Sequence, residues 1–269
     1  ETQAIQALTK QWVQDQSIDK FYDEQGICHV VLPERGHLAP GLFCVGGDSH
    51  SPTGGAFGAY MFGIGATEMA GVLATGEIWI KVPETILMSW RNQLSAYVTA
   101  KDMMLAMCRK IGMGGGRYQA IQYAGQTIQA LSMQERMTLS NMAAELGAQA
   151  GLIAPDEATV AFVQAAGGTV PANWRDFQVE AAESAENVMQ FDAASLEPQI
   201  AAPHSPENAD AADAFRNISF DVAYIGACTG AKYVDLAAAA EVLGAAYCKK
   251  CDVESCAGQF ARSKSRRAG

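Results

Sequence analysis

The stretch from residue 45 to residue 74, VGGDSHSPTGGAFGAYMFGIGATEMAGVLA, constrains the fold more than any other part of the chain. A short apolar run precedes Asp48, Ser49 and His50, and five glycines follow before an Ala- and Met-rich segment. A strand that enters a polar, glycine-lined turn before a helix is typical of α/β proteins, which often place their chemistry in such loops. An acid, a hydroxyl and an imidazole side by side supply groups for proton transfer.

The segment DSHSPTGGAFGAYMFGIGATE resembles the DSHT-x-x-x-G-x-x-G motif of the aconitase and 3-isopropylmalate dehydratase family. Three further segments are similar to the family in the same order, namely GICHVV, SNMAAELGA and IGACTGAKYVDL. The resemblance covers about residues 26–243, and four ordered matches are more specific than one glycine-rich loop. It implies an α/β fold of the aconitase type, with three-layer α/β/α domains and parallel-rich sheets.

Composition limits the classes of partner. The 269 residues, 49% of them hydrophobic, provide a core for one large or two small domains. The net charge of −10 argues against nucleic-acid and anionic-membrane partners, and no apolar run of about 18 residues predicts a transmembrane helix. The chain begins without Met or a signal-peptide pattern, so we expect a cytoplasmic protein whose N-terminal residues are missing. Seven cysteines, an odd number, favour reduced thiols or metal ligands over disulfides.

We expect three parts in the chain. Residues 1–170 form an α/β catalytic core, residues 171–214 an acidic, proline-containing connection, and residues 215–269 a partial second α/β unit with a Cys-rich basic tail. The connection contains four of the nine prolines, and its nine acids face a single Arg, which is typical of a solvated linker.

Hydrophobic spacing predicts the elements. Strands are expected over 26–32, 42–46, 77–90, 120–125 and 220–226, and helices over 1–22, 67–75, 99–112, 133–147 and 233–243. Thr99 and Gly112 are the expected N-cap and stop of one helix. Asn141 and Glu145 are four residues apart, so they emerge on one helix face and can address one site.

The resemblance implies two carboxylate–imidazole pairs with catalytic roles, Asp48 with His29 and Glu145 with His50. Such a pair fixes the tautomer of the imidazole and holds it ready for proton transfer. Without the resemblance, His29 is typical of a core histidine and Glu145 of a helix-surface acid. The family uses a third pair, an Asp-His dipeptide, which lies upstream of the first residue here.

Ser49 and Asn141 match family positions that hydrogen-bond the substrate or line the site. Without the resemblance, Ser49 is equally typical of a turn residue and Asn141 of a helix cap. Thr53 stands where some family members have Asn, a difference that bears on which substrate fits.

Cys228 lies between an expected strand and a helix, where backbone N–H groups and the positive helix end stabilise a thiolate. The resemblance implies that Cys228 is the first ligand of a [4Fe–4S] cluster and that the C-x-x-C pair Cys248 and Cys251 completes the set. The family pair lies much further downstream, whereas 19 residues separate it from Cys228 here. The pair is therefore either retained in a shortened chain or coincidental, and a zinc site that includes Cys256 is a third alternative.

The activity implied by the resemblance is that of a hydro-lyase acting on a hydroxy di- or tricarboxylic acid such as 3-isopropylmalate, with cluster iron as Lewis acid. A small, swivel-domain subunit is the implied partner, because no stretch here resembles the domain that carries the family's serine base. Homoaconitase, aconitase and methylmalate-type dehydratases are alternatives within the family. A truncated, non-catalytic remnant and a zinc-binding fragment are alternatives of other classes.

Overall fold

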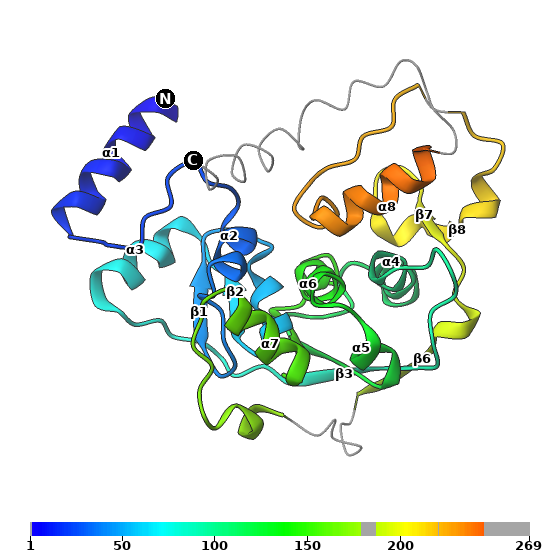
Figure 1. Cartoon of the computed structure of the whole chain (residues 1–269), viewed down its shortest axis with the longest axis horizontal. Coiled ribbons are helices and arrows are strands. Elements are labelled where there is room, and N and C mark those ends of the chain that lie inside the picture. Colours follow the sequence, from blue (N-terminus) through cyan, green and yellow to red (C-terminus); the bar gives the residue numbers. More distant parts are fainter. Residues whose placement is uncertain (1, 179–186, 220, 245–269) are drawn as a thin grey trace.

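Four parallel strands form the main sheet of the chain, of which the computed structural model describes residues 2–178, 187–219 and 221–244 (Figure 1). The strands lie in the order β5-β4-β3-β6, and they are β3 (Thr85–Arg91), β4 (Ala120–Ala124), β5 (Ala150–Ile153) and β6 (Val188–Asp192). Each neighbouring pair is parallel. The prediction of a parallel-rich α/β fold is therefore confirmed.

Two smaller sheets accompany the main one. β1 (Phe43–Gly46) and β2 (Tyr60–Gly63) pair in parallel, and β7 (Gln199–Ala201) pairs antiparallel with β8 (Ala209–Ala211). The 3₁₀ helix η1 (Ser51–Phe57) connects β1 to β2 and is buried along its whole length. The α-helices of the described ranges are α1 (Thr2–Asp15), α2 (Cys28–Glu34), α3 (Ala66–Thr75), α4 (Ala100–Ile111), α5 (Gln126–Ala130), α6 (Met133–Asn141), α7 (Glu157–Ala165) and α8 (Tyr233–Gly244).

The main core lies between the sheet and helices α4 and α6, which lie on the same side of β3 in Figure 1. Alternate residues of β3, Ile86, Met88 and Trp90, belong to one buried cluster with methionines of α4. Period-two spacing places such residues on one face of a strand. Thr99 and Gly112 cap α4 as predicted, with Asp102 completing the box at its start.

Two expected strands are helical or irregular. Residues 26–32 were expected to be extended, but α2 begins at Cys28 and packs on η1. A short apolar run does not distinguish strand from helix by periodicity alone, and here burial against η1 favours the helix. The alternating residues Ile78, Ile80 and Val82 lie outside any strand, and β3 begins only after Pro83, at Thr85. Met133–Asn141 is α-helical as predicted, but a 3₁₀ turn, η2 (Met142–Ala144), replaces the last predicted helical turns.

The strand predicted over 220–226 is absent from its described part, residues 221–226, where Val222 is 82% exposed. A strand needs a hydrogen-bonded neighbour, and none of the described strands pairs with this segment. The range 171–214, expected to be a solvated connection, instead adds β6 to the main sheet. Met189 and Phe191 of β6 pack against the core, although acidic residues surround them in the sequence. The division into three parts stays a prediction.

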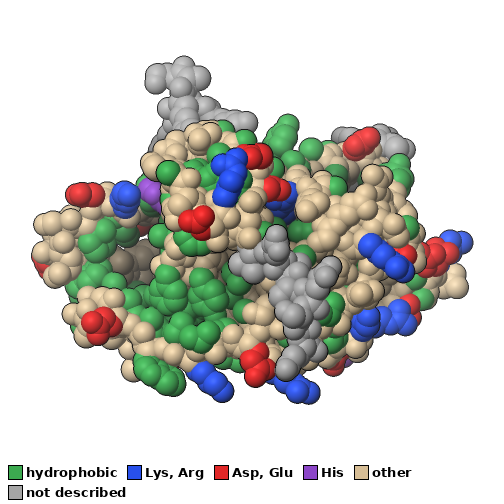
Figure 2. All heavy atoms as spheres, turned by 90° about the horizontal axis from the view of Figure 1, so that it is seen from below, with side chains coloured by type: hydrophobic (Ala, Val, Ile, Leu, Met, Phe, Trp, Pro, Cys, Tyr) green, Lys and Arg blue, Asp and Glu red, His purple; other side chains and the backbone are tan. Residues whose placement is uncertain are grey.

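Large hydrophobic side chains remain at the surface near α3, including Leu73, Trp79 and Val82. Hydrophobic side chains also gather on the face shown in Figure 2, beside a hollow in the surface. Within the described ranges, every helix falls short of the length and hydrophobicity that crossing a bilayer requires.

Candidate functional site

His50 and Glu145 meet at the centre of the site. His50 immediately precedes η1 and Glu145 follows η2, and His50 Nε2 lies 3.1 Å from Glu145 Oε1. The two side chains are 26% and 23% exposed, so solvent or a small ligand reaches them. Ser49 Oγ lies 3.5 Å from the other ring nitrogen, His50 Nδ1.

Asp48 lies between two imidazoles. Its Oδ1 accepts a hydrogen bond from the backbone N–H of His50 at 2.7 Å and lies 3.7 Å from Nδ1 of both His50 and His29. The ring centroids of His29 and His50 are 6.1 Å apart. The structure thus brings the four residues with predicted catalytic roles into one group, although Asp48 is beyond hydrogen-bond distance of the His29 ring.

His29 is a buried histidine, with its side chain 1% exposed. Burial lowers the pKa of His29, the charge of Asp48 acts in the opposite direction, and His50 and Lys232 lower the pKa further. Its Nε2 atom has no hydrogen-bond partner among the described residues, and neither has the buried Oε2 atom of Glu145. Orphaned buried polar atoms of this kind indicate a missing partner such as a ligand or water.

Asn141 joins the Asp48 loop to the Cys228 loop. Its Nδ2 donates to Thr53 Oγ1 at 2.9 Å and lies 3.7 Å from Cys228 Sγ, and its Oδ1 accepts from Thr229 Oγ1 at 2.6 Å. Thr53 in turn donates to the His50 carbonyl at 2.7 Å. Asn141 is 1% exposed, and its bond to Thr53 is buried.

Three residues that the sequence-based site omitted also belong to this group: Thr138, Thr229 and Lys232. Lys232 Nζ donates to Thr138 Oγ1 at 3.0 Å and to the Thr229 carbonyl at 2.6 Å. Thr138 lies one turn before Asn141 on α6, which is the sequence signal that could have identified it. Burial lowers the pKa of Lys232, while the charges of Asp235 and Cys228 oppose this effect.

Cys228 is half-buried at this site and is a free thiol. The Sγ atom of Cys28 lies 3.6 Å from Nδ1 of His29. Desolvation of its sulfur raises the pKa of the Cys28 thiol, and the charges of Asp48 and Cys228 raise it further. Cys248 and Cys251, the other two predicted cluster ligands, lie outside the described residues, as does Cys256. Within the described ranges, no group of three or more His, Cys, Asp or Glu side chains could hold a metal ion.

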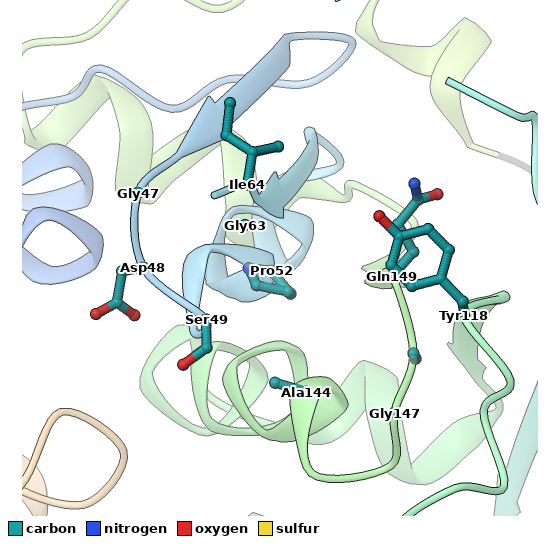
Figure 3. Close-up of a pocket in the computed structure, with 11 residues that line it drawn as sticks. Gly47, Asp48, Ser49, Pro52, Gly63, Ile64, Tyr118, Ala144, Gly147 and Gln149 are labelled. Carbon is teal, nitrogen blue, oxygen red and sulfur yellow. The ribbon is translucent and has the colours of Figure 1, made fainter. Parts of the chain in front are cut away.

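A cavity of about 390 Å³ lies beside the Asp48 loop (Figure 3). One wall of the cavity includes Asp48, Ser49 and Pro52. The opposite side includes Tyr118 and Gln149, and Gly63 and Ile64 lie between the two sides in the view. The carboxylate of Asp48 and the hydroxyl of Ser49 point away from Tyr118 and Gln149 in this view. Gln149 is held by a hydrogen bond from the Tyr60 hydroxyl.

The model of the aconitase family (aconitate hydratase) matches residues 1–215. The chain is 42% identical over 237 residues to the 3-isopropylmalate dehydratase large subunit 1 of Methanopyrus kandleri, covering 88% of this chain and 56% of that protein. It is 42% identical over 240 residues to a probable methanogen homoaconitase large subunit of Methanosarcina mazei, covering 89% and 61%. The 3-isopropylmalate dehydratase large subunit of Aquifex aeolicus is 38% identical over 240 residues, with 89% and 55% covered.

The chain therefore spans between 55% and 61% of the length of these three relatives. The family model, in contrast, accounts for most of the sequence and includes the Asp48 loop, α6 and Glu145. The chain belongs to the aconitase family.

Proposed function

We propose that this chain carries part of the active site of a hydro-lyase that dehydrates and rehydrates a hydroxy di- or tricarboxylic acid. The observation that supports this most is the His50–Glu145 contact beside Asp48, with Asn141 linking the same loop to Cys228. Segments distant in the sequence supply an acid–base group and a thiol to one place. This combination of groups is better suited to catalysing the elimination of water than to binding a ligand without chemistry.

His50 is the proposed proton carrier. Glu145 holds Nε2, which leaves Nδ1 to exchange a proton with the departing or returning hydroxyl of the substrate. The carboxylate of Asp48 accepts a hydrogen bond from the backbone N–H of His50, which fixes the backbone and thereby orients the imidazole. Ser49, the exposed hydroxyl next to His50, is proposed to hydrogen-bond the substrate.

A [4Fe–4S] cluster is the proposed cofactor, with Cys228, Cys248 and Cys251 as its ligands. Two observations support such a group: the Asn141 amide nitrogen lies 3.7 Å from the sulfur of Cys228, and the buried atoms His29 Nε2 and Glu145 Oε2 have no hydrogen-bond partner among the described residues. When bound, a cluster with one open iron supplies a Lewis acid that polarises the substrate hydroxyl. Asn141 would orient the Cys228 thiolate through its N–H.

The relatives support a proposal for the substrate class. Similarity at 42% identity to both a 3-isopropylmalate dehydratase and a probable homoaconitase supports a 3-isopropylmalate-like acid, with the homoaconitase substrate as the alternative. Both relatives are named large subunits, so we propose that a separate small subunit completes the enzyme.

Anaerobic reconstitution with iron and sulfide tests this function. The wild-type chain should bind iron and sulfide and absorb broadly near about 400 nm, as thiolate-bound clusters do. Cys228→Ser should lose this absorbance, while Cys44→Ser, which changes a half-buried thiol in β1, should keep it. Zinc without iron, or a colourless metal-free protein, would argue for the zinc-binding or the non-catalytic alternative.

The assembled enzyme gives the second readout. Mixed with the small subunit of a relative, the reconstituted chain should hydrate the unsaturated acid, and His50→Asn should lower that rate by roughly 10²–10⁴. An unaffected rate in His50→Asn would remove His50 from the mechanism.

A further inference from the structure

The loop that carries Cys228 is attached to α6 by side-chain hydrogen bonds that converge on one residue, Thr229. Its hydroxyl donates to Asn141 Oδ1, and its carbonyl accepts from Lys232 Nζ at 2.6 Å and from Thr138 Oγ1 at 3.2 Å. Lys232 Nζ also donates to Thr138 Oγ1 at 3.0 Å, which closes a ring of three groups. The loop therefore meets the same face of α6 at Thr138 and at Asn141, one turn apart.

Burial disfavours the ammonium of Lys232, and the charge of Asp235 offsets part of this effect. Its side chain is half-buried, and both acceptors that it contacts are neutral oxygens. Removing a cation from water is unfavourable unless specific hydrogen bonds compensate. A surface lysine at the start of α8 could point into solvent, so its position over the Thr229 carbonyl calls for a role.

The backbone just before Cys228 supplies an independent observation. Ala227 has φ of 68°, in the left-handed region that is unfavourable for a residue with a Cβ atom. Such a conformation persists only where surrounding contacts hold it. The contacts that can hold this turn include those of Cys228 and Thr229 with Asn141 and the bond from Lys232 to the Thr229 carbonyl. The described residues that precede the turn, 221–226, form no strand.

We infer that Lys232 is a positioning residue, which clamps the Cys228 loop onto α6 and so sets where the Cys228 thiol lies relative to Asn141. This inference rests on the proposed function only in giving that thiol a cofactor to bind. The clamp itself is a property of the metal-free chain.

Hydrogen exchange followed by mass spectrometry tests the clamp without any cofactor. In Lys232→Met the amides of 227–236 should exchange about tenfold faster, because a hydrogen bond from a charged donor is lost. Lys232→Arg retains N–H donors and should stay within about twofold of wild type. Lys101→Met is the matched control: this exposed lysine of α4 takes no part in the hydrogen bonds described above between the loop and α6, so its removal should leave the loop unchanged.

Cofactor retention supplies the second readout. After reconstitution, a chelator should bleach the absorbance of Lys232→Met about tenfold faster than that of wild type, with Lys232→Arg restoring slow loss. Exchange in α4 (Ala100–Ile111) should be equal in wild type and in the two Lys232 variants, which excludes general unfolding as the cause.

Failure of the clamp and failure of the function are separable. If the wild-type chain takes up no iron, the proposed function fails, and the exchange experiment alone decides the clamp. If Lys232→Met exchanges as slowly as Lys101→Met, or if Lys232→Arg exchanges as fast as Lys232→Met, the clamp is overturned.

Discussion

The imidazole of His50 lies 3.1 Å from the carboxylate of Glu145, although 95 residues separate the two in the chain. The contact forms because η1 packs against α6 and β5, which brings the start of η1 to the end of α6. Glu145 follows α6 through the 3₁₀ turn η2, whose buried Met142 and Ala143 anchor it. The orientation of the ring therefore depends on packing that is distant from the imidazole itself.

Glu145→Ala should release His50. Glu145 now holds Nε2, so the neutral ring should exist mainly as the Nε2–H tautomer, and loss of the carboxylate should move it toward the mixture of a free imidazole. Nitrogen-15 NMR of labelled histidine measures this ratio directly. The control is Glu157→Ala, which removes an exposed carboxylate paired with Arg175 on the surface. An unchanged tautomer ratio in Glu145→Ala would contradict the assignment.

His29 should make the free energy of unfolding depend on pH. Because burial lowers its pKa in the folded state below the ordinary value of 6.5, the unfolded chain binds more protons than the folded chain in that window. The contribution of His29 to stability is thus complete above pH 6.5 and is lost as the pH falls toward the lowered folded-state pKa.

Urea unfolding at about pH 5.5 and about pH 7.5 checks this dependence. Wild type should be less stable at the lower pH, and His29→Phe should show a smaller difference between the two. His204→Asn, a change at an exposed histidine with positive φ that Asn tolerates, should keep the wild-type difference. Equal pH dependence in wild type and His29→Phe is the result that this account cannot accommodate.

The local parts of the fold could be read from the sequence. Strand β1, helix α3 and helix α4 were predicted to within about two residues, because capping residues and period are local signals. The prediction of a strand over 220–226 was wrong in its described part, 221–226, for the opposite reason. Its apolar residues suit a buried strand, yet a strand depends on neighbours that the sequence of the segment itself does not reveal.

The site also divides into residues that the sequence predicted and residues whose role depends on distant packing. The grouping of His50 with Glu145 was predicted through the resemblance. The spacing of Asn141 and Glu145 predicted one face of one helix, but α6 ends at Asn141 and Glu145 follows the 3₁₀ turn η2. Lys232 escaped prediction because an isolated lysine before a helix is normally a solvated surface residue. Its contact with Thr138 depends on the turn at Ala227, whose left-handed backbone carries no sequence signal in a non-glycine residue.

Asp156 combines two stabilising roles that mutation can separate. Its Oδ1 accepts from the backbone of Thr159 at the start of α7, and its Oδ2 lies 2.7 Å from Nη2 of Arg136, whose side chain is 1% exposed. Burial alone raises the pKa of Asp156, but the hydrogen bonds from Arg136 and Thr159 outweigh burial and lower the pKa below its ordinary value.

Asp156→Ala removes both roles and should lower the free energy of unfolding by about 3 kcal/mol. Asp156→Asn retains a helix cap and should lose roughly 1 kcal/mol less. Asp213→Ala, which breaks an exposed pair with Arg216, should change stability by at most about 0.5 kcal/mol. Urea unfolding measures all three, and equal losses in the two Asp156 variants would exclude the cap as a contributor.

The approach of η1 to β5 depends on Gly55. A Cβ atom at this position would lie 1.9 Å from the carbonyl oxygen of Gly151 in β5, a backbone atom that cannot rotate away. Gly55→Ala should therefore push η1 from the sheet, destabilise the chain by at least about 2 kcal/mol and weaken the His50–Glu145 contact.

Gly71→Ala provides the opposite case within the same chain. Gly71 lies on the exposed side of α3, and a Cβ atom there meets nothing within 4 Å. Alanine should stabilise this helix by about 0.5–1 kcal/mol because it has the higher helix propensity. Thermal unfolding of the two variants measures the change in stability, and the histidine NMR measurement reports whether the His50–Glu145 contact is weakened. A Gly55→Ala chain as stable as Gly71→Ala would show that η1 can move without disturbing the site, and the close contact with Gly151 would then have no part in placing His50.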